Sequence, residues 1–143
     1  MRVVGFIGPS GTGKSHRATW VAKERGIDFI IDDGILIRGN RIVAGRSAKR
    51  EATKIASVKC ALFQSDEHAH DVKRALELYK PSALLILGTS EGMVEKIASR
   101  LEVGPVNEKI YITDVASEFE INLAKSTRMQ QGKHVIPVPT FEI

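Results

Sequence analysis

The stretch MRVVGFIGPSGTGKSHRA, residues 1–18, joins an apolar run to a glycine-rich loop and then to a helical pattern. The run from Val3 to Ile7 is rich in β-branched residues, which is typical of a buried strand. Residues 8–15 then spell GPSGTGKS, a full match to the pattern G-x-x-x-x-G-K-[ST]. The spacing therefore predicts a strand, a tight loop and a helix in direct succession.

The glycines of this loop give the backbone an anion-binding shape. Gly8, Gly11 and Gly13 allow successive N–H groups to point inward, and the positive end of the following helix adds to their attraction for anionic oxygens. The alternative without a binding function is a glycine turn beside an unrelated lysine.

The same residues resemble the Walker A motif of P-loop nucleotide-binding proteins. The resemblance implies that Lys14 reaches the β- and γ-phosphates of a nucleoside triphosphate and that the Ser15 hydroxyl binds Mg²⁺. The cofactors that it implies are ATP and Mg²⁺. The residues expected to bind the nucleotide are Gly8, Pro9, Ser10, Gly11, Thr12, Gly13, Lys14, Ser15 and His16.

Length and composition restrict the class of protein. A chain of 143 residues, 43% hydrophobic and 27% charged, corresponds to one globular domain. No segment approaches the ~20 consecutive apolar residues of a membrane-spanning helix, so we expect no membrane partner. The loop begins at residue 8, where cleavage of a leader would destroy it, and Cys60 has no second cysteine to pair with. These features favour a reducing cytoplasm.

Apolar runs predict about five strands that alternate with helices. They lie at residues 3–7, 29–31, 83–87, 109–113 and 134–139. Such alternation is typical of a mainly parallel sheet with helices on both faces, a three-layer α/β/α arrangement, here of the P-loop NTPase type. With no repeat or linker, residues 1–143 are expected to form a single P-loop nucleotide-binding domain, with a small hairpin insertion near residues 33–45.

Capping residues predict where several helices begin. Ser47 is placed to cap a long helix whose apolar side includes Ile55. Ser65 is placed to cap the next helix, and Ser117 with Glu120 forms a capping box for a later one.

Acidic residues that directly follow a strand are the candidates for metal and acceptor contacts, because ligands of open α/β sheets lie outside the carboxyl ends of the strands. The second predicted strand ends in Asp32–Asp33 and the fourth at Asp114, whereas the third is followed by no acid before Glu91. This pattern resembles small metabolite kinases of the shikimate kinase type, which have acids after the second strand and a glycine-rich turn after the third. The resemblance assigns Asp32 and Asp33, with Ser15, to Mg²⁺.

Each of these acids also has an alternative interpretation. Asp33 is equally the first residue of an Asp-Gly turn, and Asp114 is more simply a helix-entry residue ahead of Ser117. Asp32 has no such local explanation, because a carboxylate at the edge of an apolar strand needs a partner or water.

Basic residues cluster after the predicted hairpin, at Arg46, Lys49, Arg50, Lys54 and Lys59. In kinases, arginines on a mobile segment close over the phosphates, so Arg46 and Arg50 are candidate catalytic residues beside Lys14 and Asp32. We expect the segment from 35 to 54, the hairpin tip at Gly39–Asn40 included, to face the glycine-rich loop across a cleft. The alternatives are a solvated helix face and a nucleic-acid surface, and the latter is disfavoured because no aromatic residue interleaves with the charges.

The residues together favour an ATP-binding P-loop protein, a small Mg²⁺-dependent phosphotransferase or ATPase whose acceptor is an unidentified small molecule or protein. The alternative is a nucleotide-dependent regulatory protein without turnover. A GTPase is disfavoured because the chain has no N-K-x-D segment. His68 and His70 predict no zinc site, because residues two apart on a helix point in different directions.

Overall fold

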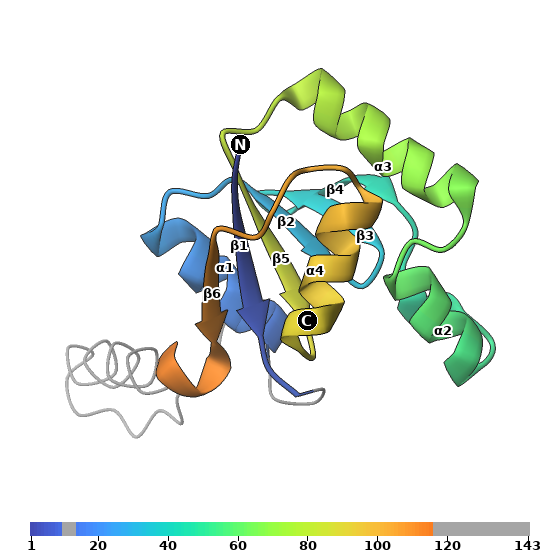
Figure 1. The fold of residues 1–143 in the computed structure, drawn as a ribbon, viewed down its shortest axis with the longest axis horizontal. Helices are drawn as coiled ribbons and strands as arrows, with labels where there is room; N and C mark the ends of the chain where they lie inside the picture. Colours follow the sequence, from blue (N-terminus) through green and yellow to red (C-terminus); the bar gives the residue numbers. More distant parts are fainter. Residues whose placement is uncertain (10–13, 116–143) are drawn as a thin grey trace, which may run out of the picture.

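The computed structural model describes residues 1–9 and 14–115, and Figure 1 shows them as a twisted sheet flanked by helices. The sheet has six strands in the order β4-β3-β2-β5-β1-β6. The strands are β1 (Arg2–Ile7), β2 (Phe29–Asp32), β3 (Ile35–Arg38), β4 (Arg41–Gly45), β5 (Ala83–Gly88) and β6 (Glu108–Tyr111). The helices are α1 (Lys14–Glu24), α2 (Lys54–Ala61), α3 (Asp66–Tyr79) and α4 (Glu91–Arg100), with a 3₁₀ helix η1 (Ala48–Arg50).

Four strands form a parallel core. β1 pairs in parallel with β5 on one side and with β6 on the other, and β5 pairs in parallel with β2. All six residues of β5 are buried, as a strand with helices on both faces requires. The expectation of an α/β protein with a mostly parallel sheet is confirmed.

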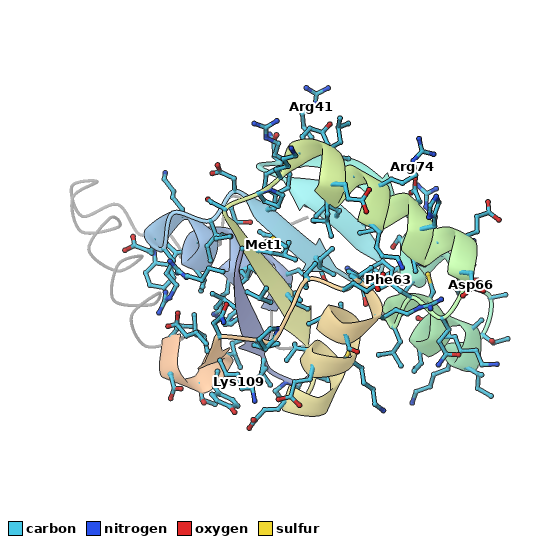
Figure 2. The ribbon with its side chains drawn as sticks, turned by 45° about the horizontal axis from the view of Figure 1, so that its top comes forward. Met1, Arg41, Phe63, Asp66, Arg74 and Lys109 are labelled. Atoms are coloured by element: carbon cyan, nitrogen blue, oxygen red, sulfur yellow. The ribbon has the colours of Figure 1, made fainter. Side chains whose placement is uncertain are left out.

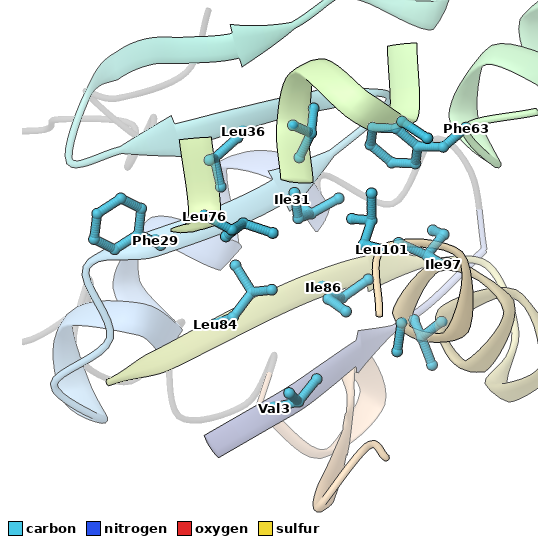
Figure 3. Packing of buried hydrophobic residues seen from close by; sticks show 14 of the residues in the cluster. Val3, Phe29, Ile31, Leu36, Phe63, Leu76, Leu84, Ile86, Ile97 and Leu101 are labelled. Atoms are coloured by element: carbon cyan, nitrogen blue, oxygen red, sulfur yellow. The ribbon is translucent and has the colours of Figure 1, made fainter. Parts of the chain in front are cut away.

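Two apolar clusters lie on the two faces of this core. On one face Ala18 and Val21 of α1 pack against alternate residues of β1 and β5, such as Val4 and Leu85. On the other face, side chains of α3 and α4 meet the remaining residues of the strands; Figure 3 shows Leu76, Ile97 and Leu101 in this cluster with Ile31 and Ile86. The helices therefore cover the parallel strands from both sides.

The hairpin of β3 and β4 extends the sheet. β3 pairs antiparallel with β2, and β4 pairs antiparallel with β3. The expected count of about five strands was wrong, because two hairpin strands pair with the edge of β2 and join the main sheet. The strand expected at 134–139 and the helix expected after Ser117 lie outside the described residues.

The tip of the hairpin lies beside the amino end of β2, whereas the glycine-rich loop follows the carboxyl end of β1. Arg38 pairs with Phe29, the first residue of β2, and the Gly39 N–H donates to the Asp28 carbonyl at 3.1 Å. The expectation that Gly39–Asn40 faces the loop was therefore wrong. β3 starts beside the carboxyl end of β2 and runs antiparallel to it, so the turn that follows β3 lies beside the amino end of β2.

The long helix expected from Ser47 is divided in two. The Ser47 hydroxyl accepts the Lys49 N–H and caps only η1, while Thr53 caps α2 by accepting the Ala56 N–H at 3.0 Å. Between them Glu51 is extended, with φ −74° and ψ 144°. Ile55, expected to face inward, has 70% of its surface exposed. Two competing caps six residues apart explain the break, because each requires an extended residue.

The remaining boundaries are close to those expected. Ser65 caps α3, and Lys80 ends it with a left-handed φ of 48°, directly before Pro81. β6 ends at Tyr111, so Asp114 lies in a helical turn and does not end a strand. Within residues 1–9 and 14–115, no helix combines the length and apolar character needed to cross a bilayer.

Candidate functional site

The connections of the sheet make the carboxyl ends of β1 and β5 a topological switch point. The chain leaves β1 through α1, which covers one face, and leaves β5 through α4, which covers the other face. β1 and β5 are neighbours that stay paired up to their carboxyl ends, Ile7 opposite Gly88, and the helices that follow them lie on opposite faces of the sheet (Figure 1). In open α/β sheets ligands bind at such a switch point.

The GPSGTGKS segment begins at this switch point. Gly8 follows the last residue of β1, and its N–H donates to the Gly88 carbonyl at the end of β5, at 3.1 Å. The backbone of α1 begins at Lys14, and Ser15 in its first turn is exposed. Ser10, Gly11, Thr12 and Gly13 lie outside the described residues, as do the side chains of Lys14 and His16.

Asp32 lies at the carboxyl edge on the same face of the sheet as α1. It follows Ile31, which pairs with Ile86 of β5, and it is half-buried. Side chains alternate along a strand, and Ile30 belongs to the α1-side cluster, so Asp32 projects to that face. The end of β2 and the first turn of α1 thus bring Asp32 and Ser15 to one edge and one face.

Asp33 and Gly34 form the two-residue turn between β2 and β3. Their φ angles are 52° and 89°, the pair of positive values that a tight hairpin turn requires. A side chain at Gly34 is excluded for a second reason, because its Cβ would lie 2.4 Å from the Arg46 carbonyl oxygen. Asp33 is therefore a turn residue, and its carboxylate lies 4.0 Å from the Lys49 ammonium. Asp32–Asp33–Gly34 is called the acid turn below.

His68 of α3 holds the acid turn from the other side of the sheet. Its Nε2 lies 2.6 Å from the Gly34 carbonyl oxygen, so Nε2 carries the proton and donates it. The Arg46 N–H, 3.3 Å from the same nitrogen, donates instead to the Gly34 carbonyl at 3.2 Å. His68 is 4% exposed, and its Nδ1 has no hydrogen-bond partner among the described residues. No sequence pattern indicated this contact, because it joins residues 34 positions apart.

The segment after β4 returns to the carboxyl edge and contacts the acid turn. Gly45 is opposite Ile35, which is opposite Asp32, so the end of β4 is level with the end of β2. The Ala48 N–H donates to the Asp33 carbonyl at 2.8 Å. These backbone contacts fix residues 46–48 beside the turn.

Arg46 and Arg50 lie at the expected edge but not beside β1. Four strand spacings of about 4.8 Å, or about 19 Å, separate β4 from β1 in the sheet. Arg46 is exposed, with its Nε 3.8 Å from a Glu51 carboxylate oxygen, and Arg50 is exposed as well. Their catalytic role stays a prediction, one that requires the segment to move toward the loop.

On the other side of the switch point, α4 and β6 carry a charged group that we did not expect. The Tyr111 hydroxyl donates to the Glu91 carboxylate, and Lys109 donates to Glu91 at 3.0 Å and to Glu95 at 2.6 Å. The hydrogen bond from Tyr111, and then Lys109, lowers the pKa of Glu91, while the same bond to Glu91 raises the pKa of Tyr111. Glu91 is therefore ionised at neutral pH, three residues after the end of β5.

This group ties the edge strand β6 to α4 and stands apart from the basic segment. Figure 2 shows Lys109 on the β6 side of the molecule, away from Phe63 and Asp66 at the corner of α2 and α3. Lys109 offsets one of the two negative charges of the glutamates that it contacts, Glu91 and Glu95, so the group carries a net charge of −1.

Metal binding depends here on few protein ligands. No cluster of three or more histidine, cysteine or acidic side chains with the spacing of a metal site occurs in residues 1–9 and 14–115. Mg²⁺ in nucleotide sites needs fewer, since phosphate oxygens and water complete its six ligands. One carboxylate and one hydroxyl at the same edge and face, Asp32 and Ser15, fit that requirement.

Comparison with known proteins gives no relative. The chain matches no family of known proteins, no curated protein and no solved structure.

Proposed function

We propose that the chain binds ATP with Mg²⁺ at the switch point between β1 and β5, as a P-loop protein of the small-kinase type. The observation that carries the proposal is the position of the uninterrupted GPSGTGKS sequence. It lies between the end of a central parallel strand and the start of α1, at the switch point of the sheet. A motif of this kind has meaning only in that strand–loop–helix context.

Each residue of the proposed site has a distinct task. Backbone N–H groups of residues 8–15 surround the phosphates, and the Lys14 ammonium neutralises charge on the β- and γ-phosphates. The Ser15 hydroxyl and the Asp32 carboxylate would hold Mg²⁺, with Asp33 as the other candidate acid. Mg²⁺ in such a site supplies charge neutralisation of the phosphate oxygens.

A second candidate function is nucleotide binding without phosphoryl transfer. Transfer to an acceptor requires the site to exclude water, since water otherwise takes the phosphoryl group. The hairpin tip at Gly39–Asn40 lies beside the amino end of β2, away from the carboxyl ends of the strands. Of the segment from 35 to 54, the start of β3, the end of β4 and the residues that follow β4 are at the carboxyl ends of the strands, which leaves little of the segment to cover a nucleotide.

The experiment that tests the proposal compares Lys14→Ala with the unchanged protein in calorimetric titration with ATP and Mg²⁺. We expect affinity to fall by about 100-fold or more, equivalent to about 2.7 kcal/mol, because a buried phosphate charge loses its cation. Lys23→Ala is the matched control: Lys23 is exposed in the last turn of α1, and its loss should leave affinity unchanged. Equal affinity of Lys14→Ala and the unchanged protein would contradict the proposal.

A turnover measurement then separates the two candidate functions. Formation of ADP and release of inorganic phosphate from ATP are both measured, with and without small-molecule extracts. Hydrolysis produces both, transfer to an acceptor produces ADP without free phosphate, and binding alone produces neither. A protein that binds ATP but neither hydrolyses it nor consumes it with an acceptor is the binding protein of the second candidate.

A further inference from the structure

The positive charge of the chain is concentrated in residues 46–59. This stretch holds five basic residues and one acidic residue, a net charge of +4, which equals the net charge of all 143 residues. The rest of the chain is therefore neutral overall. We call residues 46–59, which comprise η1, the start of the following turn and most of α2, the basic surface.

Three cations of the basic surface have no anionic partner within residues 1–9 and 14–115. Arg46 lies 3.8 Å from Glu51 and Lys49 lies 4.0 Å from Asp33. In the described part of the chain, no ion pair involves Arg50, Lys54 or Lys59, all of which are exposed.

The outward face of α2 is apolar at its centre. At 100° per residue, Ile55 and Val58 lie 60° apart, with Lys54 on one side of the pair and Lys59 on the other. Ile55 is 70% exposed and Val58 is 52% exposed. The buried Cys60 is on the opposite face, and the buried Ala61 lies about 90° around the helix from the pair. The helix thus shows solvent two aliphatic side chains between two lysines.

The basic surface is attached to the body through a small set of contacts. Ala48, Cys60 and Ala61 form a separate apolar cluster, with Met93 of α4 packed against it. Figure 1 shows α2 at the corner of the molecule beyond the carboxyl ends of the strands. Beside α2 lies a cavity of about 350 Å³ whose lining includes Arg46, Lys59 and Gln64.

We propose that the basic surface docks an acidic protein segment that also carries aliphatic side chains. Carboxylates of the partner contact Arg50, Lys54 and Lys59, and its aliphatic side chains pack on Ile55 and Val58. The charge complementarity selects an anionic partner, while burial of the aliphatic pair supplies affinity that charge alone does not. This inference goes beyond ATP binding and does not depend on it.

Two other anionic partners fit the surface less well. A single-stranded nucleic acid needs aromatic side chains for base stacking, and Phe63, the aromatic residue nearest to this stretch in sequence, is fully buried. An anionic bilayer needs an amphipathic helix with a broad apolar face, whereas α2 has eight residues and presents two aliphatic side chains.

The test is an NMR titration of the nucleotide-free chain with a synthetic 15-residue peptide of glutamate and leucine at helical spacing. We expect amide shifts confined to residues 46–61, with the affinity falling as salt rises. Three comparison probes are used. Two are a glutamate-only peptide and an oligo-deoxythymidine, each of the same length as the test peptide. The third is a preparation of phosphatidylcholine and phosphatidylserine vesicles, whose binding is measured by co-sedimentation.

Paired variants locate the binding. Ile55→Ser with Val58→Ser should weaken peptide binding by about fivefold or more, and Lys54→Glu with Lys59→Glu by about tenfold or more. The matched controls are Leu78→Ser, 77% exposed on α3, and Lys96→Glu, exposed on α4; both should change affinity by less than about twofold. All six positions are exposed, and circular dichroism of each variant checks its fold.

Four outcomes would overturn the proposal. They are the absence of shifts in residues 46–61, equal binding of the glutamate-only peptide, tighter binding of the oligonucleotide, and sedimentation with the anionic vesicles. ATP is absent from every sample, so a negative result here leaves the Lys14 experiment to decide ATP binding separately.

Discussion

The parallel strands β2, β5, β1 and β6 are called the parallel half below, and the antiparallel strands β3 and β4 the antiparallel half. The two parts of the sheet bury their residues very differently. In the parallel half every residue of β5 is buried, and helices lie on both faces. In the antiparallel half no residue of β4 is fully buried, and Ile42 exposes 64% of its surface. The same sheet therefore contains a strand that is all interior and a strand that is largely surface.

This difference in burial separates the residues that stabilise the fold from the residues that remain exposed for contacts with other molecules. Burial of β5 removes its apolar surface from water, which is the main favourable term in folding. Residues 46–48, which follow β4, instead use their backbone to hold the acid turn, and the exposed residues after them form the basic surface. The antiparallel half contributes Leu36 of β3 to the core, and its last strand leads into the contacts beside the candidate site.

The largest effect that this comparison predicts is the contrast between Ile86→Ala and Ile42→Ala. Ile86 is fully buried in β5, so its truncation should lower the free energy of unfolding by about 3 kcal/mol or more, through lost burial and a new cavity. Ile42→Ala should change it by less than about 0.5 kcal/mol, as for most exposed sites. Urea denaturation of both variants measures the two values.

Because the two variants remove the same atoms from the same residue type, they control for side-chain chemistry. Similar losses in both would mean that the outer face of β4 is covered in solution, and the division into an interior half and a surface half would not hold.

The next effect concerns His68, which connects the two halves. α3 packs on the apolar cluster of the parallel strands and also lies against β4, and His68 donates from it to the Gly34 carbonyl in the turn that begins the antiparallel half. His68→Leu should cost about 2 kcal/mol, because it removes a buried hydrogen bond and mismatches the space of the ring. His68→Gln should recover part of this loss, since the amide can place a donor near the position of Nε2.

Hydrogen exchange shows whether the loss occurs at the turn. In His68→Leu the N–H groups of Arg46 and Ala48, which donate to the acid turn, should exchange faster than in the unchanged protein. His70→Leu is the control, since His70 is exposed two residues further along the same helix. Unchanged exchange in His68→Leu would show that the backbone of residues 46–48 holds the turn without the histidine.

The sequence predicted the parallel half better than the antiparallel half, and the reason is physical. A strand buried on both faces must be apolar throughout, so ALLIL at 83–87 identifies β5 without knowledge of its neighbours. The hairpin was visible from its Asp-Gly and Gly-Asn turns, and the Asp-Gly turn itself pairs β3 with β2. The hairpin was interpreted as a small insertion, so its two strands were not counted in the main sheet. The outward turn of Ile55 also escaped prediction, because the apolar spacing of α2 is compatible with either orientation.

The site shows the same division. The glycine-rich segment is a continuous pattern, and its expected place between a strand and a helix is confirmed by β1 and α1. Asp32 lies at the end of a strand as expected, and the phosphate and metal roles of these residues stay predictions. The contact of His68 with Gly34 was missed, since nothing in an H-x-H spacing indicates a partner 34 residues away. The separation of Arg46 from β1 depends on strand order, which the sequence alone does not specify.

The smallest effect tests the boundary between the halves, where β2 ends at Asp32. If Asp32 holds Mg²⁺ with Ser15, Asp32→Asn should weaken ATP binding by about tenfold when Mg²⁺ is present, because a neutral amide replaces the charged ligand. Binding in excess chelator should change little. Asp28→Asn is the matched control: Asp28 is exposed at the other end of the same strand, so its loss should change neither value. A tenfold loss both with and without Mg²⁺ would instead assign Asp32 to the packing of the edge, since a metal ligand cannot act where no metal is bound.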